Sequence, residues 1–166
     1  NGFSLVRRVA EVAGLGWDAP WDASRGASWG PPGEGTTLGE ALLTPTRLYV
    51  RPALAAIRAG GVHALAHVTG GGLTENLPRV LPEGLGATVD LGAWRLPPVF
   101  AWLRSAGGIA EAEMLKTFNA GIGMVLAVEA GRAEALAGLL AEAGETVVRL
   151  GEVGPGQGVT YQGQLD

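Results

Sequence analysis

The chain has 166 residues, of which 47% are hydrophobic and 17% charged, and its formal net charge at pH 7 is −4. This length fits a single domain with a substantial core, and the composition excludes a disordered chain. The negative charge argues against nucleic-acid binding, no apolar run is long enough for a membrane span, and the lack of cysteine excludes disulfides and thiolate metal sites. We therefore expect a cytoplasmic protein.

The N-terminal stretch, residues 3–13, has the apolar spacing of an amphipathic helix. Its predicted inner face consists of Val6, Val9, Ala10 and Ala13. Residues 14–37 are rich in glycine, proline, serine and aspartate, and they predict a long loop. We expect the three tryptophans of this loop to attach it to the protein surface rather than to stack on a ligand: Trp17, Trp21 and Trp29.

Two helices and a strand are predicted between residues 37 and 68. A short helix covers residues 37–43 and is stopped by Pro45. The next helix begins near Leu48 and carries Pro52 in its first turn, where proline is tolerated. Its predicted buried face is Val50, Leu54 and Ile57. Residues 62–68 alternate between faces as a strand does.

The second half of the sequence alternates strands with helices. Strands are predicted over residues 85–91, 121–129, 146–150 and 159–162, and helices over residues 97–106, 109–116 and 132–143. The run from 121 to 129 is the most apolar and is the predicted central strand. The alternation predicts an α/β (α+β) fold with a mixed β-sheet flanked by helices.

Three consecutive glycines, Gly70, Gly71 and Gly72, follow the strand at 62–68 and precede a helical turn from Leu73 to about Val80. Glycine leaves backbone amides unshielded, and N–H groups at a helix N-terminus attract anions. The turn therefore predicts phosphate binding, with a tight connection in a glycine-rich protein as the alternative. It is neither a Walker loop nor a dinucleotide fingerprint, because no Gly-Lys-Ser/Thr follows and the glycines are consecutive.

Two histidines, His63 and His67, lie four residues apart in the predicted strand. At about 3.3 Å per residue their rings stand about 13 Å apart, so we expect no shared metal ion. His67 directly precedes the glycine turn, and two interpretations stay open: an anion contact or proton-transfer group, and a structural histidine. We expect His63 to be structural.

A second polar stretch, residues 117–124, precedes the predicted central strand. Thr117 and Asn119 either line a site at the end of the sheet or only hold the turn through backbone hydrogen bonds. Glu75 is either an acid–base or metal-binding carboxylate or a charge that complements the helix dipole. The residue types alone leave each of these pairs open.

Two long motifs point to a known family. They are His67-Val-Thr-Gly-Gly-Gly-Leu-Thr-Glu-Asn-Leu-Pro-Arg-Val-Leu-Pro82 and Lys116-Thr-Phe-Asn-Ala-Gly-Ile-Gly-Met124. Both strongly resemble the C-terminal domain of aminoimidazole ribonucleotide synthetase, also called phosphoribosylformylglycinamidine cyclo-ligase. Residues 1–9 and 43–50 match that domain as well, so the resemblance covers essentially the whole chain.

The resemblance implies a two-domain ligase of purine biosynthesis, with residues 1–166 as a single domain forming its C-terminal half. ATP would phosphorylate the formyl oxygen of formylglycinamidine ribonucleotide, and a ring-closing nitrogen would then displace phosphate to give aminoimidazole ribonucleotide. ATP and Mg²⁺ would be held mainly by the N-terminal half, which we expect to be missing, so no metal ligand is expected here. We expect this chain to be inactive alone and the full-length enzyme to be a homodimer.

The resemblance also implies an active site in the cleft between the two domains. Gly70, Gly71 and Gly72 would cradle a phosphate, with His67 as the catalytic candidate. The further contacts would be Thr69, Asn76, Thr117 and Asn119. Two alternatives remain: the same domain from formylglycinamidine ribonucleotide synthetase, thiamine monophosphate kinase, selenophosphate synthetase or a hydrogenase maturation factor, and a non-enzymatic anion-binding module.

Overall fold

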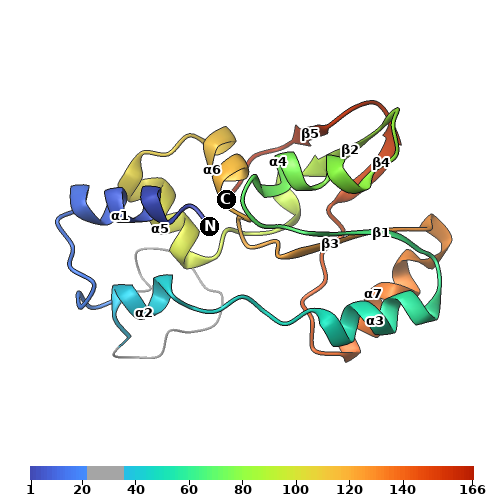
Figure 1. Ribbon diagram of the computed structural model, residues 1–166, viewed down its shortest axis with the longest axis horizontal. Helices are drawn as coiled ribbons and strands as arrows, with labels where there is room; N and C mark the ends of the chain where they lie inside the picture. Colours follow the sequence, from blue (N-terminus) through green and yellow to red (C-terminus); the bar gives the residue numbers. More distant parts are fainter. Residues whose placement is uncertain (22–35) are drawn as a thin grey trace.

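The computed structural model describes residues 1–21 and 36–166 (Figure 1). The helices are α1 (Phe3–Val12), α2 (Leu38–Leu42), α3 (Val50–Ala59), α4 (Gly72–Asn76), α5 (Pro98–Gly107), α6 (Glu111–Thr117) and α7 (Ala133–Glu142), with short 3-10 turns η2 (Pro78–Val80), η3 (Leu91–Ala93) and η4 (Ala130–Arg132). The strands are β1 (Val62–His67), β2 (Leu85–Asp90), β3 (Met124–Val128), β4 (Gly151–Pro155) and β5 (Val159–Gln162). Most of the predicted 14–37 loop, with Trp29, lies outside the described residues.

The strands form two separate sheets, and the fold is mixed α+β as the sequence predicts (Figure 1). β1 and β3 pair antiparallel, whereas β2 lies between antiparallel β4 and parallel β5. The prediction that residues 121–129 form a central strand is wrong, because within the described residues β3 pairs with β1 alone. Its five residues are all only half-buried, and among the described residues no strand pairs with its other edge.

Two clusters of buried side chains form the core. One lies around β2, α4 and the chain end, and its most buried members are Leu73, Leu91 and Leu165. The other joins α1, α2, α5 and α6. Its buried residues are Val6, Val9, Ala10, Leu38, Trp102, Leu103, Met114 and Phe118.

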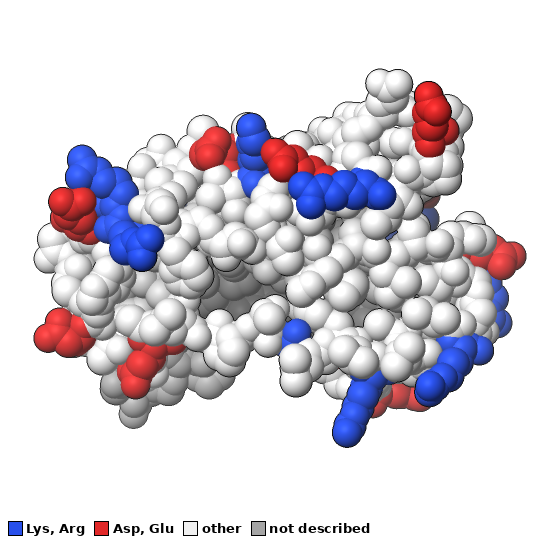
Figure 2. Space-filling view, in the orientation of Figure 1, with Lys and Arg blue, Asp and Glu red and all other residues white. Residues whose placement is uncertain are grey.

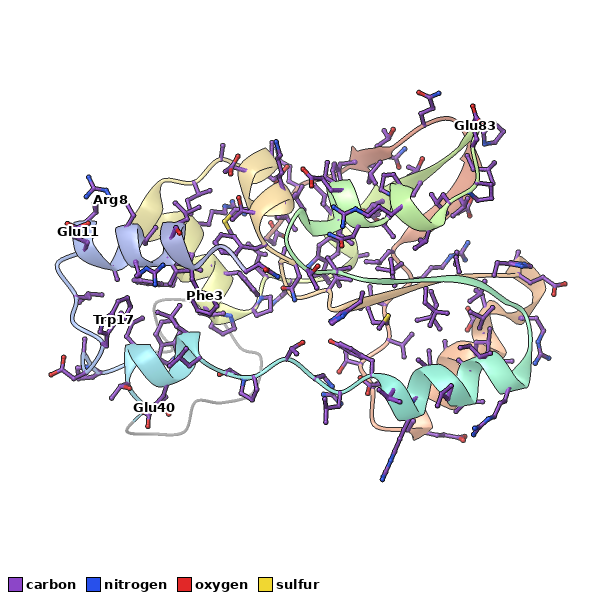
Figure 3. The ribbon with its side chains drawn as sticks, in the orientation of Figure 1. Phe3, Arg8, Glu11, Trp17, Glu40 and Glu83 are labelled. Carbon is purple, nitrogen blue, oxygen red and sulfur yellow. The ribbon has the colours of Figure 1, made fainter. Side chains whose placement is uncertain are left out.

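Helix α1 confirms its predicted face except at the end. Val6, Val9 and Ala10 are buried, but Ala13 is exposed because the helix ends at Val12. Arg8 and Glu11 point away from the core and form an ion pair of 2.8 Å on the outer face (Figure 3). The amphipathic pattern therefore predicts the buried side of this helix correctly, apart from Ala13.

The two tryptophans of the described part of the loop behave differently. Trp21 meets the buried Trp102 edge-on, with 6.1 Å between ring centroids, and so attaches the loop to the second cluster. Trp17 is 50% exposed.

Helix α3 buries a different face from the one predicted. Val50, Leu54 and Ile57 are 66%, 42% and 47% exposed, while Pro52 and Ala56 are buried. α3 packs beside α7 (Figure 1). Apolar residues cover this helix except on the side of Arg51 and Arg58, so the sequence excludes that side but does not specify which part of the wide apolar surface meets a neighbour.

The predicted strand at 146–150 is also wrong, since β4 begins only at Gly151. Its register is set by β2, with Val89 opposite Gly151 and Leu85 opposite Pro155. A side chain at Gly151 would overlap the carbonyl oxygen of Thr88, so a glycine permits this close pairing. Within the described residues, no helix combines the length and apolarity needed to cross a membrane.

Candidate functional site

The glycine turn connects β1 to α4. The N–H of Gly72 donates to the carbonyl of Thr69 at 3.0 Å and closes the turn. Gly71 and Gly72 have φ values of 94° and 56°, in the left-handed region that glycine enters without strain, whereas Gly70 lies outside that region. The reversal from strand to helix therefore depends on the second and third glycines.

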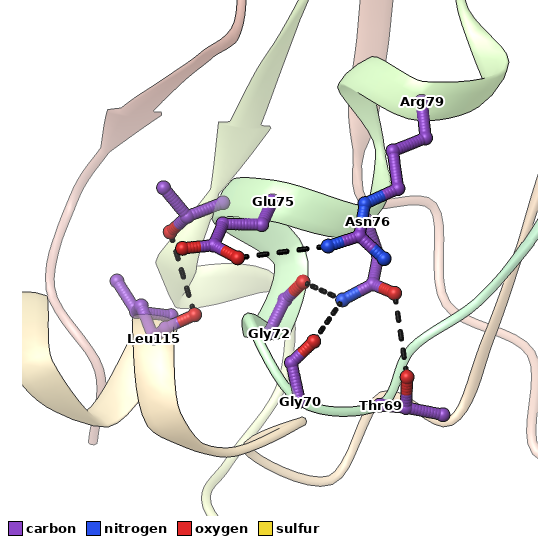
Figure 4. Close-up of polar contacts among 8 residues, drawn as sticks. Thr69, Gly70, Gly72, Glu75, Asn76, Arg79 and Leu115 are labelled. Carbon is purple, nitrogen blue, oxygen red and sulfur yellow. Dashed lines mark hydrogen bonds and ion pairs between the residues drawn. The ribbon is translucent and has the colours of Figure 1, made fainter.

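Asn76 supports the turn from inside (Figure 4). It is 6% exposed, and its Nδ2 donates to the carbonyls of Gly70 at 3.1 Å and Gly72 at 2.7 Å. Its Oδ1 accepts from the Thr69 hydroxyl at 3.4 Å. In a trans peptide the C=O and the next N–H point in opposite directions, so the N–H of Gly71 points away from Asn76.

Gly72 is a packing residue. It is buried, and a Cβ there would overlap the carbonyl oxygen of Leu115 and lie 2.7 Å from that of Phe118. The hydroxyl of Thr74 also donates to the Leu115 carbonyl at 3.4 Å. The third glycine thus lets α4 touch the end of α6, and the accessible part of the turn is Gly70 and Gly71.

A carboxylate lies beside Gly71. A Cβ built on Gly71 would lie 2.6 Å from Oε2 of Glu75, which in turn pairs with Arg79 at 3.6 Å. Both charged side chains are roughly half exposed, so solvent screens them. The carboxylate weakens the positive potential of the bare amides, and the Arg79 guanidinium offsets part of that effect.

The 117–124 stretch comes to the same end of the β1–β3 pair. The N–H of Val68 donates to the carbonyl of Gly123 at 2.9 Å, which holds this stretch against the start of the glycine turn. Oδ1 of Asn119 accepts from the N–H of Gly121 at 3.0 Å, and the hydroxyl of Thr117 donates to Glu113 at 2.6 Å. The Thr117 hydroxyl is therefore already hydrogen-bonded within α6.

A cavity of about 90 Å³ lies between these segments. Its lining residues are Asn1, Val68, Thr69, Phe100, Phe118 and Asn119. It brings together Thr69 and Asn119, two of the contacts that the resemblance implies, and it adds Asn1 and two phenylalanines that sequence reasoning missed. A larger cavity of about 480 Å³, near Arg104 and Asp166, contains none of the predicted site residues.

The signal that could have found Asn1 is the glycine that follows it. Gly2 has a φ of 76°, and a Cβ there would lie 2.5 Å from the ring of Phe118. This close approach fixes Asn1 at the mouth of the cavity. An Asn-Gly pair directly before a helix marks a special backbone position, but nothing in the sequence shows which ring it meets.

His67 lies apart from the cavity lining. It is exposed, and its ring meets that of Tyr49 edge-on, with 5.9 Å between centroids. Burial raises the pKa of Tyr49 above its ordinary value, Glu145 raises it further, and Arg47 lowers it. The register between β1 and β3 shifts between Val62 and Ala64, and His63 has no partner in β3. The regular alternation of side chains between the two faces of the strand is therefore interrupted at His63.

Within the part of the chain that the structure describes, no three histidine, cysteine or acidic side chains are grouped so that they could hold a metal ion. Figure 2 shows charged side chains of both signs along the edges and across the upper part of one face, with mostly uncharged side chains between them. A family model described as "AIR synthase related protein, C-terminal domain" matches residues 1–164.

Proposed function

The chain belongs to the family of AIR synthase related proteins, as their C-terminal domain, and from this premise we propose that it is the substrate-binding half of an ATP-dependent cyclo-ligase. The superfamily comprises ATP-using enzymes. The proposed reaction is ring closure of formylglycinamidine ribonucleotide to aminoimidazole ribonucleotide, in purine biosynthesis and in the cytoplasm. The two long motifs at 67–82 and 116–124 support this member of the superfamily.

The observation that carries the proposal is the meeting of both motifs at one end of the β1–β3 pair. The two motifs share the hydrogen bond from Val68 to Gly123, and residues of both line one small cavity beside the glycine turn. Among the described residues, the N–H groups of Gly70 and Gly71 donate to no backbone carbonyl. We assign these two amides to a phosphate oxygen, and Thr69 and Asn119 to the rest of the substrate.

The side chains of this domain indicate which ligands it would bind and which the partner domain would bind. Among the described residues, no three histidine, cysteine or acidic side chains are grouped to hold a metal ion, so these residues do not fit Mg²⁺. The proposed mechanism therefore gives this chain no role in binding the metal. We propose that ATP and Mg²⁺ are held mainly by a partner domain, and that the complete enzyme is a homodimer that binds neither nucleic acid nor a membrane. An amide oxygen is a poor leaving group, so phosphorylation before ring closure is the chemical reason for using ATP.

Turnover tests the reaction. A longer form of the protein that includes the preceding domain should convert formylglycinamidine ribonucleotide with ATP into aminoimidazole ribonucleotide, ADP and phosphate. The 166-residue chain alone should give no product. The assignment fails if the longer form instead phosphorylates thiamine monophosphate or selenide, or makes formylglycinamidine ribonucleotide from its precursor.

Phosphate binding tests the glycine turn. Inorganic phosphate should raise the thermal midpoint of the chain, because a ligand of the folded state stabilises it. Glu75→Gln should enlarge this shift, because it removes the carboxylate beside Gly71. Gly71→Val should abolish the shift, and Gly70→Ala, whose φ suits alanine, should reduce it without the backbone strain of the first variant. A shift unchanged in both glycine variants would place the phosphate elsewhere.

A further inference from the structure

The small cavity beside the glycine turn is lined by uncharged side chains in the described part of the chain. Its volume of about 90 Å³ corresponds to about three water molecules at roughly 30 Å³ each. That space suits a small polar group rather than a ribonucleotide. Size alone would also admit a phosphate, so the chemistry of the lining must decide.

The walls disfavour an anion. The rings of Phe100 and Phe118 lie 5.6 Å apart at 53°, and Phe118 is only 3% exposed. A phosphate placed against such walls loses hydration, and no lining side chain supplies a positive charge in exchange, which leaves the Asn1 amino group as the one cation on the described lining residues. A neutral planar group avoids that cost and can lie against an aromatic face.

The polar groups of the lining match an amide. Oδ1 of Asn119 is already bonded to the N–H of Gly121, so its Nδ2 is left to donate. The Thr69 hydroxyl donates to Asn76, so its lone pairs are left to accept. A neutral amide presents one carbonyl acceptor and one N–H donor, which complement these two groups.

Asn1 joins the cavity to the turn. A Cβ built on Gly70 would lie 3.4 Å from Oδ1 of Asn1, so the Asn1 side chain lies next to the first glycine of the turn. We infer that the cavity of Asn1, Thr69 and Asn119 is a binding site for a neutral amide group. If the proposed function is taken as the premise, that amide is the formamido end of formylglycinamidine ribonucleotide.

N-methylformamide is the probe that tests this inference. Titrated into the ¹⁵N-labelled 166-residue chain at millimolar concentration, it should shift the amide signals of Thr69 and Asn119 and the Nδ2 signal of Asn119. N119D keeps an oxygen to accept from Gly121 but replaces the donor by a carboxylate. It should weaken N-methylformamide binding about tenfold, the loss of roughly one hydrogen bond, and it should bind acetamidinium, a planar cation, more tightly than the parent.

Two controls accompany the titration. Gln164→Glu makes the same amide-to-acid change at an exposed residue outside the cavity and should leave binding unchanged. An N-terminal acetyl group removes the charge of the Asn1 amino group and should not weaken binding of the neutral probe. The thermal midpoint of N119D verifies that the variant is folded.

The inference is overturned if inorganic phosphate, and not N-methylformamide, moves the Thr69 and Asn119 signals. It is equally overturned if a folded N119D binds N-methylformamide as the parent does. Neither result depends on turnover. If a longer enzyme makes aminoimidazole ribonucleotide but the cavity does not bind N-methylformamide, only this inference is refuted. If the cavity binds N-methylformamide but the longer enzyme does not make aminoimidazole ribonucleotide, only the proposed reaction is refuted.

Discussion

Each glycine of the 70–72 turn has its own physical role. Gly70 lies next to the Asn1 side chain with its amide exposed, Gly71 takes a left-handed conformation beside Glu75, and Gly72 lets α4 touch two carbonyls at the end of α6. Only the first two are accessible to a ligand, because Gly72 is buried. A run of identical residues thus combines folding and binding requirements.

Gly72→Ala should destabilise the protein by about 3 kcal/mol or more, because it combines a strained φ with overlap on the Leu115 carbonyl. Gly70→Ala should cost less than about 1 kcal/mol, since its φ is ordinary and its nearest neighbour, the Asn1 side chain, lies at 3.4 Å. Urea unfolding of both variants provides the comparison. Equal losses would show that Gly72 is not a packing residue.

Asn76→Asp should be costly at pH 7, by about 2 kcal/mol or more, because the carbonyls of Gly70 and Gly72 lose their donor and face a buried carboxylate. The loss should shrink as the pH falls toward about 4, because burial beside two carbonyls raises the pKa of the introduced carboxyl and its protonated form can donate one hydrogen bond. Asn119→Asp is the matched control, since Asn119 accepts from Gly121 and an aspartate can do the same. Unfolding of both variants at pH 3.5 and 7 measures the difference.

At the level of secondary structure, α2 is defined by its N-terminus. The hydroxyl of Thr37 accepts from the N–H of Glu40 at 3.2 Å, and the Glu40 carboxylate accepts from the N–H and hydroxyl of Thr37. These bonds, the backbone one first, hold the pKa of Glu40 below its ordinary value of 4.5. Such a reciprocal cap is what allows a helix of five residues to form here.

Thr37→Ala should therefore cost about 1 kcal/mol, and Thr37→Ser much less, because serine keeps the hydroxyl. The pKa of Glu40 should rise toward its ordinary value in the alanine variant, which an NMR titration can follow. Because a lowered pKa stabilises the fold above about 4.5 and this contribution disappears as the pH falls, the stability difference between the two variants should narrow in acid to the part due to the hydroxyl bond with the Glu40 N–H. A constant difference down to pH 2 would contradict this account.

Helix α3 gives a second prediction at this scale. Leu54→Ser should change stability by less than about 1 kcal/mol, because the leucine is 42% exposed. Ala56→Leu should cost about 1–3 kcal/mol, because Ala56 is fully buried and the larger side chain overfills its site. Thermal or urea unfolding distinguishes this face from the predicted one, on which Leu54 would be the sensitive residue.

At the level of the whole molecule, Tyr161 links the three-stranded sheet to the glycine turn. Its hydroxyl lies 2.9 Å from that of Thr74, the residue that also bonds to Leu115. Burial raises the pKa of Tyr161 above its ordinary value of 10, and the hydrogen bond to Thr74 partly opposes that rise. The site is thereby attached to both β5 and α6.

The raised pKa has a defined sign. As the pH rises, Tyr161 loses its proton at a lower pH in the unfolded chain than in the folded chain. The protonated tyrosine therefore contributes its full stability below about pH 10, and this contribution is lost as the pH rises through the pKa of the folded state. Between pH 10 and about 11.5, the free energy of unfolding should fall less steeply with pH in Tyr161→Phe than in the parent protein. Tyr49→Phe provides the comparison at the other tyrosine. An identical pH profile for Tyr161→Phe and the parent would refute the assignment.

The sequence by itself determined what depends on neighbours along the chain. The helix periodicity of residues 3–12, the stop at Pro45 and the glycine turn at 70–72 are local features, and each was predicted within a residue or two. The α+β class followed from the same local patterns, whereas the grouping of Thr69 with Asn119 was implied only by the family resemblance.

The tertiary structure alone decided which surfaces meet. The exposed face of α3, the start of β4 at Gly151 and the pairing of β3 with β1 depend on partners far along the chain. The same holds for the cavity, where Asn1 and Phe118 are brought together by packing on Gly2. Hydrophobic burial has no direction of its own, so an apolar residue specifies that it will be covered but not by what.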